Sequence, residues 1–181
     1  GIFKAVFLAG GPGSGKSYVA HQLFGIPEKV NVSKTGLKMV NQDQELEMLL
    51  KKFYGGDDPT LDYLNIQAYP PELFKQLTDP DFEDYSGLRG SAKYLSQKRM
   101  GQYLKGRLGV IIDGTGHKFN AVKKQRKELI DMGYDTYMVF VTTSLEVAQE
   151  RNELRPRRLP EDTVEKYWKE VQNNLAFFQG L

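Results

Sequence analysis

One short segment constrains this chain more than any other: residues 10–17 read Gly-Gly-Pro-Gly-Ser-Gly-Lys-Ser. The segment matches the pattern G-x-x-x-x-G-K-[ST] and directly follows a nearly continuous apolar run at residues 2–9. Such a run is typical of a strand buried on both faces of a parallel sheet. Glycines let successive backbone N–H groups surround a phosphate together with the N-terminus of the next helix. The segment therefore predicts a strand, a phosphate-binding loop and a helix.

The loop also predicts contacts to a nucleoside triphosphate. We expect Lys16 to reach the β- and γ-phosphates and Ser17 to ligate Mg²⁺ through its hydroxyl. The chain contains no guanine-reading sequence of the Asn-Lys-x-Asp type, which argues against a GTPase switch. The expected cofactors are ATP and Mg²⁺. The predicted cofactor-binding residues are Gly11, Gly13, Ser14, Gly15, Lys16, Ser17 and Tyr18.

The rest of the chain alternates apolar runs with helical patterns. Strands are expected at residues 37–40, 109–112 and 136–141, and helices at residues 119–132, 144–153 and 161–178. This alternation predicts an α/β protein with the three-layer P-loop NTPase fold, in which helices flank a parallel sheet. At 181 residues, the length favours a single domain spanning 1–181. Glycines and prolines break residues 44–107 into short helical pieces, which we interpret as a helical insertion on the acceptor side.

Two aspartates follow predicted strands. Asp43 comes after the second strand, where its carboxylate can accept the proton of a substrate hydroxyl; alternatively, it caps a helix over residues 44–53. Asp113 comes after the third strand and is followed by Gly-Thr-Gly-His. It is a candidate partner for Mg²⁺ together with Ser17, or alternatively a cap for the next helix. The predicted substrate-binding residues are Asp43, Asp113, Thr115 and Arg157.

Four arginines fall within eight positions between two helices: Arg151, Arg155, Arg157 and Arg158. A planar guanidinium binds phosphate oxygens bidentately, so residues 151–160 are interpreted as a lid over the transferring phosphoryl group. The alternative is a solvated loop that pairs with neighbouring acidic residues. The predicted catalytic residues are Lys16, Asp43, Arg151, Arg155 and Arg158.

Composition excludes several other classes of protein. The chain has no cysteine and two histidines, which excludes disulfides, thiol catalysis and Cys-based zinc sites. No apolar run is long enough to cross a bilayer, so we expect no membrane partner and a cytoplasmic location. The net charge of +2 conceals an asymmetry, because residues 1–90 carry −3 and residues 91–181 carry +5. This asymmetry suits an anionic partner, although solvated helix faces would produce it equally well.

Taken together, these motifs resemble the P-loop kinases that include zeta toxins and phage-type polynucleotide 5′-kinases. The resemblance rests on residues 10–17, 40–43, 110–116 and 151–160. It implies that Asp43 is the general base and that Arg151, with one or more of the other three arginines, stabilises the transferring phosphate. Residues 113–116 look more like a zeta toxin, and the arginine segment more like a polynucleotide kinase. Leu46 stands where polynucleotide kinases usually have an arginine.

The sequence therefore predicts a P-loop kinase that moves the γ-phosphoryl group of ATP to a hydroxyl of a nucleotide-containing acceptor. A polynucleotide 5′-hydroxyl is slightly favoured over a UDP-sugar because phosphate contacts supply most non-specific affinity for nucleic acid. A hypothesis of another class is a nucleotide-sensing or ATP-hydrolysing module with an unidentified protein partner. The basic residues behind the nucleic-acid preference are Lys93, Lys98, Arg99, Lys123, Lys124, Arg126 and Lys127.

Overall fold

The computed structural model describes residues 2–26, 32–55, 62–78 and 87–180. In these residues, four parallel strands form one sheet in the order β2-β3-β1-β4. The strands are β1 (Phe3–Ala9), β2 (Lys38–Asn41), β3 (Val110–Asp113) and β4 (Tyr134–Phe140). All four strands predicted from apolar runs are present, with ends shifted by one or two residues.

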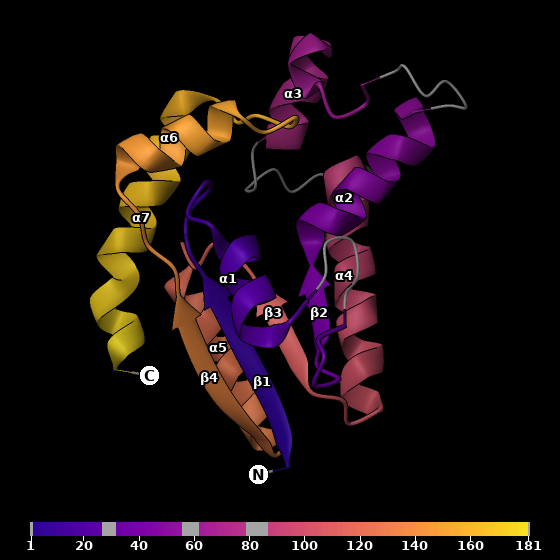
Figure 1. Ribbon diagram of the computed structural model, residues 1–181. Helices are drawn as coiled ribbons and strands as arrows, with labels where there is room; N and C mark the ends of the chain where they lie inside the picture. The colour runs from indigo at the N-terminus through magenta and orange to yellow at the C-terminus, as the bar shows by residue number, and fades with distance from the viewer. Residues whose placement is uncertain (1, 27–31, 56–61, 79–86, 181) are drawn as a thin grey trace.

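Within the described residues, seven α-helices connect and cover the strands (Figure 1). They are α1 (Lys16–Phe24), α2 (Gln42–Leu50), α3 (Pro71–Thr78), α4 (Leu88–Lys105), α5 (Phe119–Asp131), α6 (Leu145–Glu153) and α7 (Glu161–Gln179). A π-helical turn at Lys51–Gly55 extends α2, and a 3₁₀ turn lies at Ile66–Ala68. The Ser144 side chain accepts a hydrogen bond from the backbone N–H of Val147 and caps α6, as the sequence predicts.

Alternate side chains of β1 build the two halves of the core. Ala5 and Phe7 enter one apolar cluster, which includes Leu129 of α5. Val6 and Leu8 enter the opposite cluster, which includes Ala20 of α1. Figure 1 shows α1 in front of the sheet and α5 behind it. Because a strand turns successive side chains to opposite faces, β1 is buried on both sides. The three-layer α/β P-loop fold predicted from the sequence is confirmed.

The segment predicted as an insertion has an apolar cluster of its own. Leu46 and Leu50 of α2 pack there with Leu77 of α3 and Ala92 of α4. Further along α4, Met100 packs into the sheet core, so this helix belongs to both clusters. The insertion is thus anchored to the sheet through α4. The glycines and prolines predict breaks at 55–59, 69–71 and 79–80 in this segment. The break at 69–71 falls between the 3₁₀ turn and the start of α3, and residues 56–59 and 79–80 lie outside the described residues.

The parallel arrangement brings the carboxyl ends of all four strands to one edge of the sheet, the upper edge in Figure 1. In open α/β sheets this edge is where ligands bind. Asp113, at the end of β3, is paired with Asn41 of β2 on one side and with Leu8 of β1 on the other. The ends of β2 and β3 therefore lie beside the start of the phosphate-binding loop. Among the described residues, no helix combines the length and apolarity required to span a membrane.

Candidate active site

The phosphate-binding loop adopts a conformation that requires glycine. Gly13 and Gly15 have φ angles of 73° and 94°, in the left-handed region. A Cβ atom on Gly13 would lie 2.2 Å from the backbone oxygen of Ala148 in α6, so the loop also packs tightly against that helix. Gly15 is the N-cap of α1, and the backbone N–H groups that follow it remain available at the helix N-terminus. The loop and α1 therefore form an anion site of backbone amides.

Lys16 folds back over this loop. Its Nζ donates to the backbone oxygens of Gly10 at 2.7 Å and Gly11 at 3.4 Å. The buried Ser14 hydroxyl has no hydrogen-bond partner among the described residues, whereas Ser17 is exposed at the start of α1. Tyr18 is 70% exposed on the same helix. All seven predicted cofactor-binding residues thus lie in the loop and the first turn of α1, where Ser17 and Tyr18 are exposed.

Asn41, at the end of β2, links the two predicted aspartates. Its side-chain Nδ2 donates to Asp113 Oδ2 at 2.8 Å, and its Oδ1 accepts from the backbone N–H of Asp43 at 2.8 Å. Asn41 is therefore the N-cap of α2, and the alternative that Asp43 caps this helix is wrong. The alternative for Asp113 is also wrong, because α5 begins after Lys118. Neither carboxylate therefore caps a helix.

Asp113 is suited to hold a cation. Burial raises its pKa to about 6; the Lys16 charge opposes this shift, while Asp43 adds to it. Its Oδ1 is buried without a hydrogen-bond partner among the described residues. No group of three acidic or imidazole ligands occurs in the part of the chain that is described. This composition fits Mg²⁺, which binds through one or two protein oxygens and takes substrate phosphates and water as its other ligands.

Asp43 lies under a buried arginine from the predicted lid. Arg157 Nη2 is 3.1 Å from Asp43 Oδ1, and Arg157 Nε is 3.7 Å from Glu47 Oε1. Only 5% of Arg157 is exposed. Desolvation, the largest influence, would raise the pKa of Asp43, but the charges of Arg157, Arg89, Arg155 and Lys16 together lower it below its ordinary value. The carboxylate is therefore held ionised within a cationic surrounding.

The other lid arginines have different positions. Arg151 Nη1 donates to the backbone oxygens of Gly13 and Ser14, both at 3.3 Å, and so lies on the phosphate-binding loop. Burial and the neighbouring Arg157 lower the pKa of Arg155, while Asp43, Glu47 and Asp113 raise it, which places Arg155 among the site carboxylates. Arg158 instead pairs with Glu153 at 3.1 Å at the surface. Three of the four arginines thus lie at the phosphate-binding loop or near the two aspartates. The fourth, Arg158, pairs with an acidic neighbour at the surface, as the solvated-loop alternative predicts.

The loop after β3 is fixed by α7. Thr115 hydrogen-bonds through its hydroxyl to His117 Nδ1, and its backbone oxygen accepts from the N–H of Gly10 at 3.0 Å. The His117 ring packs edge-on against Tyr167 with centroids 4.9 Å apart. Asn174 donates to the backbone oxygens of both Gly116 and His117. Thr115 therefore connects the phosphate-binding loop to α7.

Three site residues escaped the sequence analysis: Asn41, Glu47 and Arg89. Glu47 lies one helical turn after Asp43, and this spacing could have indicated that both carboxylates lie on one face of α2. Asn41 required the register of β2 against β3. Arg89, at the start of α4, donates to the backbone oxygen of Leu77 at 2.5 Å and lowers the pKa of Asp43. Only the folding of the insertion brings it near the site.

Comparisons with known proteins agree with this geometry. The model of the AAA domain family matches residues 6–177, and the chain belongs to that family. No curated protein matches. Among solved structures, the chain is similar to one in the Pnkp1/Rnl/Hen1 RNA repair complex at 19% identity, with a TM-score of 0.61, over 97% of this chain and 46% of that one.

Two further structures share the fold. One is from the AvrRxo1-ORF1:AvrRxo1-ORF2 complex with sulphate ions, at 14% identity and a TM-score of 0.68, covering 98% of this chain and 50% of that one. The other is from the PezAT toxin–antitoxin system of Streptococcus pneumoniae, at 16% identity and a TM-score of 0.60, covering 98% and 64%. The chain thus spans about half to two thirds of their length. These neighbours agree with the group predicted from the sequence, and they share the α/β P-loop fold of this chain.

Proposed function

We propose that this protein transfers the γ-phosphoryl group of ATP to a hydroxyl group of a nucleotide-containing acceptor. The observation that carries the proposal is the position of Asp43. This carboxylate lies at the carboxyl edge of the sheet, pairs with a buried lid arginine at 3.1 Å and is within the electrostatic influence of Lys16. A phosphate-binding loop alone serves hydrolysis equally well, but a carboxylate at the same edge of the sheet as the loop provides a place for an acceptor hydroxyl.

Binding of the donor requires a rearrangement of Lys16. Its ammonium group now satisfies the backbone oxygens of Gly10 and Gly11, and phosphate oxygens would take their place. The amides at the start of α1 hold the β-phosphate. Ser17 and Asp113 would hold Mg²⁺, which neutralises charge on the β- and γ-phosphate oxygens when bound.

In the transfer step, the acceptor hydroxyl oxygen forms a bond to the γ-phosphorus and the bond from that phosphorus to the β–γ bridging oxygen breaks. The hydroxyl proton passes to Asp43, and ADP leaves with the bridging oxygen. Because the transition state is loose, a carboxylate with a lowered pKa still serves by orienting the nucleophile. Asp43 must exchange its contact with Arg157 for the acceptor, and Glu47 offers Arg157 an alternative partner at 3.7 Å.

We assign to the arginines the stabilisation of the negative charge that develops on the transferring phosphoryl group. Arg151 already lies on the phosphate-binding loop, and Arg155 and Arg157 lie among the carboxylates. Preorganised cations stabilise the equatorial oxygens of the transferring group. A catalytic role for Arg158 requires that it leave Glu153.

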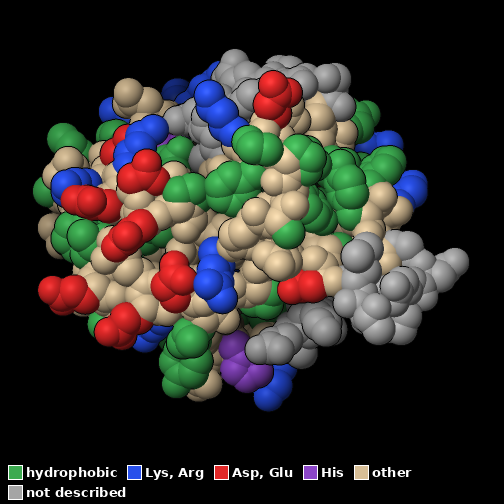
Figure 2. All heavy atoms as spheres, turned by 90° about the horizontal axis from the view of Figure 1, so that it is seen from above, with side chains coloured by type: hydrophobic (Ala, Val, Ile, Leu, Met, Phe, Trp, Pro, Cys, Tyr) green, Lys and Arg blue, Asp and Glu red, His purple; other side chains and the backbone are tan. Residues whose placement is uncertain are grey.

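The sequence raises two candidate acceptors, a polynucleotide 5′-hydroxyl and a UDP-sugar. Three of the basic residues that favoured a polynucleotide are paired internally: Arg99 with Glu45 at 2.8 Å, Lys124 with Glu128 at 4.0 Å and Lys127 with Asp131 at 2.7 Å. Figure 2 shows acidic side chains gathered on the α6 and α7 side of the upper face, with several lysine and arginine side chains between them. These pairings reduce the support for a polynucleotide and leave a compact nucleotide, such as a UDP-sugar, at least as well supported.

The test uses Asp43→Asn, with the exposed Asp131→Asn of α5 as the matched control. Each protein is incubated with ATP labelled on the γ-phosphate and a panel of 5′-hydroxyl oligonucleotides, nucleotides and UDP-sugars. We expect transfer to fall by ~10²-fold or more in Asp43→Asn, with ATP affinity retained and the control unchanged. If wild-type protein hydrolyses ATP while no acceptor gains label, the proposal is wrong and an ATP-hydrolysing module with a protein partner replaces it. The cytoplasmic location also stays a prediction.

A further inference from the structure

Asn41 uses both ends of its side-chain amide at the edge of the sheet. It is the last residue of β2 and is paired in register with Asp113, the last residue of β3. Its Nδ2 group donates to Asp113 Oδ2, and its Oδ1 atom accepts from the backbone N–H of Asp43, both at 2.8 Å. A backbone N–H only donates and an ionised carboxylate only accepts, so these two partners fix the orientation of the amide. One side chain therefore connects the end of β3 with the start of α2.

A helix cap accounts for only half of this arrangement. Asn41 is the N-cap of α2, and its oxygen supplies the acceptor that a cap requires. Serine and aspartate cap a helix about as well as asparagine. Neither of them carries, beside the capping oxygen, a separate donor group for a neighbouring carboxylate. The amide nitrogen therefore indicates a role of Asn41 beyond the helix cap.

The hydrogen bond to Asp113 decides which oxygen of that carboxylate stays available. Oδ2 is occupied by Asn41, whereas Oδ1 is buried and has no hydrogen-bond partner among the described residues. A donor on one oxygen holds the plane of the carboxylate and leaves the other oxygen to a cation. Loss of such a hydrogen bond to a metal-binding group typically lowers metal affinity or activity by about 10- to 100-fold. Asp113 Oδ1 is therefore the atom that Asn41 would present to Mg²⁺.

The capping bond places Asp43. This residue is the second of α2, and its backbone N–H is one of the donors at the helix N-terminus that have no partner within the helix. Because Asn41 accepts from it, the first turn of α2 is fixed, and with it the point from which the Asp43 side chain starts. That side chain then pairs with Arg157 at 3.1 Å.

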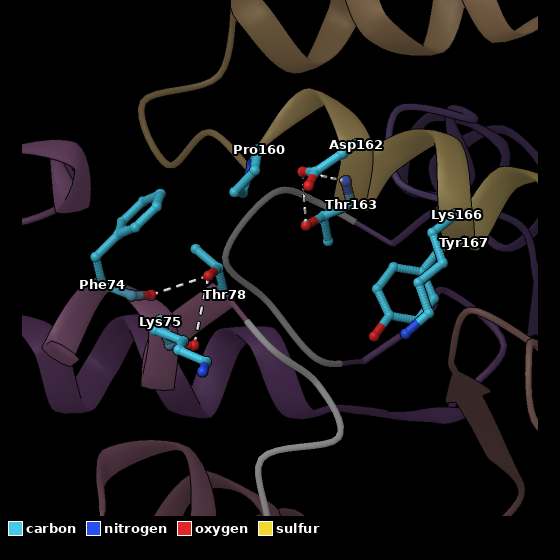
Figure 3. A pocket seen from close by; sticks show the side chains of 8 residues that line it. All are labelled: Phe74, Lys75, Thr78, Pro160, Asp162, Thr163, Lys166 and Tyr167. Carbon is cyan, nitrogen blue, oxygen red and sulfur yellow. Dashed lines mark hydrogen bonds between the residues drawn. The ribbon is translucent and has the colours of Figure 1, made fainter. Parts of the chain in front are cut away.

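These contacts are separate from the pocket between α3 and the start of α7, which Figure 3 shows. Among the described residues, the lining of that pocket includes neither Asn41 nor either aspartate. A substitution at Asn41 therefore leaves the side chains that line the pocket unchanged.

We propose that Asn41 is a positioning residue that orients Asp113 toward Mg²⁺ through Nδ2 and the base Asp43 toward the acceptor hydroxyl through Oδ1. The part that concerns Asp43 rests on the proposed kinase function. The part that concerns Asp113 requires only the binding of ATP with Mg²⁺. The two ends of the amide therefore have separable effects.

The binding test compares Asn41→Ser, which keeps a capping oxygen and loses the donor to Asp113, with Asn41→Ala, which loses both. The matched control is Asn173→Ser, the same change at an exposed position of α7. Calorimetry measures the affinity for a non-hydrolysable ATP analogue in Mg²⁺ and in EDTA, and we call the ratio of the two affinities the Mg²⁺ effect. Both Asn41 variants should bind about tenfold more weakly in Mg²⁺ and as tightly as wild type in EDTA, with the control unchanged.

Unfolding and kinetics separate the capping bond from the donor. In EDTA, Asn41→Ala should unfold about 2–4 °C below wild type, whereas Asn41→Ser should stay within about 1 °C. With the acceptor that wild type labels best, Asn41→Ser should raise the KM for ATP in Mg²⁺ about tenfold and keep kcat within about twofold. Asn41→Ala should in addition lower kcat about threefold or more, because its base is poorly oriented.

Three results would overturn the proposal. A Mg²⁺ effect in Asn41→Ser equal to that of wild type would reduce Asn41 to a helix cap. A loss of affinity as large in EDTA as in Mg²⁺ would show damage to the phosphate-binding loop instead of the cation site. A kcat of Asn41→Ala equal to that of wild type would refute the placement of Asp43. Failure of the kinase proposal is recognised separately, because no acceptor then gains label while the Mg²⁺ effect is still measured by binding alone.

Discussion

Replacing Asp113 with asparagine tests the electrostatics of the site most directly. Burial raises the pKa of this carboxyl group from 3.8 to about 6, so its ionised form is disfavoured in the folded protein. At about 1.4 kcal/mol for each tenfold change in an equilibrium constant, this difference costs about 3 kcal/mol of folding free energy when the group is fully ionised. Asparagine keeps an oxygen that can accept the hydrogen bond from Asn41 and carries no charge.

The contribution of Asp113 to the free energy of unfolding depends on pH. Below 3.8 both folded and unfolded forms are protonated, and Asp113 costs nothing. Between 3.8 and about 6 the folded protein retains a proton that the unfolded chain has lost, so stability due to this residue falls as pH rises. We therefore expect Asp113→Asn to be more stable than wild type by about 1.5 kcal/mol at pH 5 and about 3 kcal/mol at pH 8.

Thermal and urea unfolding in the presence of EDTA measure this difference, with Asp131→Asn as the surface control. For a chain of this size, 3 kcal/mol corresponds to roughly 6–12 °C in Tm. The same variant should lose the stabilisation that Mg²⁺-ATP gives the wild type, because a cation ligand is removed. A variant less stable than wild type at pH 8, or a difference that is equal at pH 5 and pH 8, would refute the reasoning.

Two further predictions concern the loop and the lid. Gly13→Ala should destabilise the protein by about 2 kcal/mol or more and weaken ATP binding at least tenfold, because φ is positive and the new Cβ would meet the backbone of α6; Gly101→Ala, in an open position of α4, should instead stabilise by about 0.5–1 kcal/mol in the same unfolding assay. Arg157→Lys should lower kcat about 10- to 100-fold, because a lysine cannot span Asp43 and Glu47 together. Steady-state kinetics would contradict this placement if Arg158→Lys, at the surface, lost as much.

Local sequence determined the sheet and the phosphate-binding loop. The buried strands, the glycine-rich turn, the Ser144 cap and the long helix before the C-terminal end depend on contacts close along the chain or on simple periodicity. The position of Asp43 after β2 followed from the same logic, because parallel strands end at one edge. These features were predicted correctly because each depends on residues within one or two elements.

Only the tertiary structure decided how the site is completed. The register of β2 on β3 placed Asn41 against Asp113, and the packing of the insertion brought Arg89 toward Asp43. Four arginines of nearly equal local context took different partners, and burial of one beside two carboxylates distinguished Arg157 from Arg158. Such choices depend on distances between segments far apart in sequence and on the desolvation of charges. Neither quantity is encoded in any local pattern.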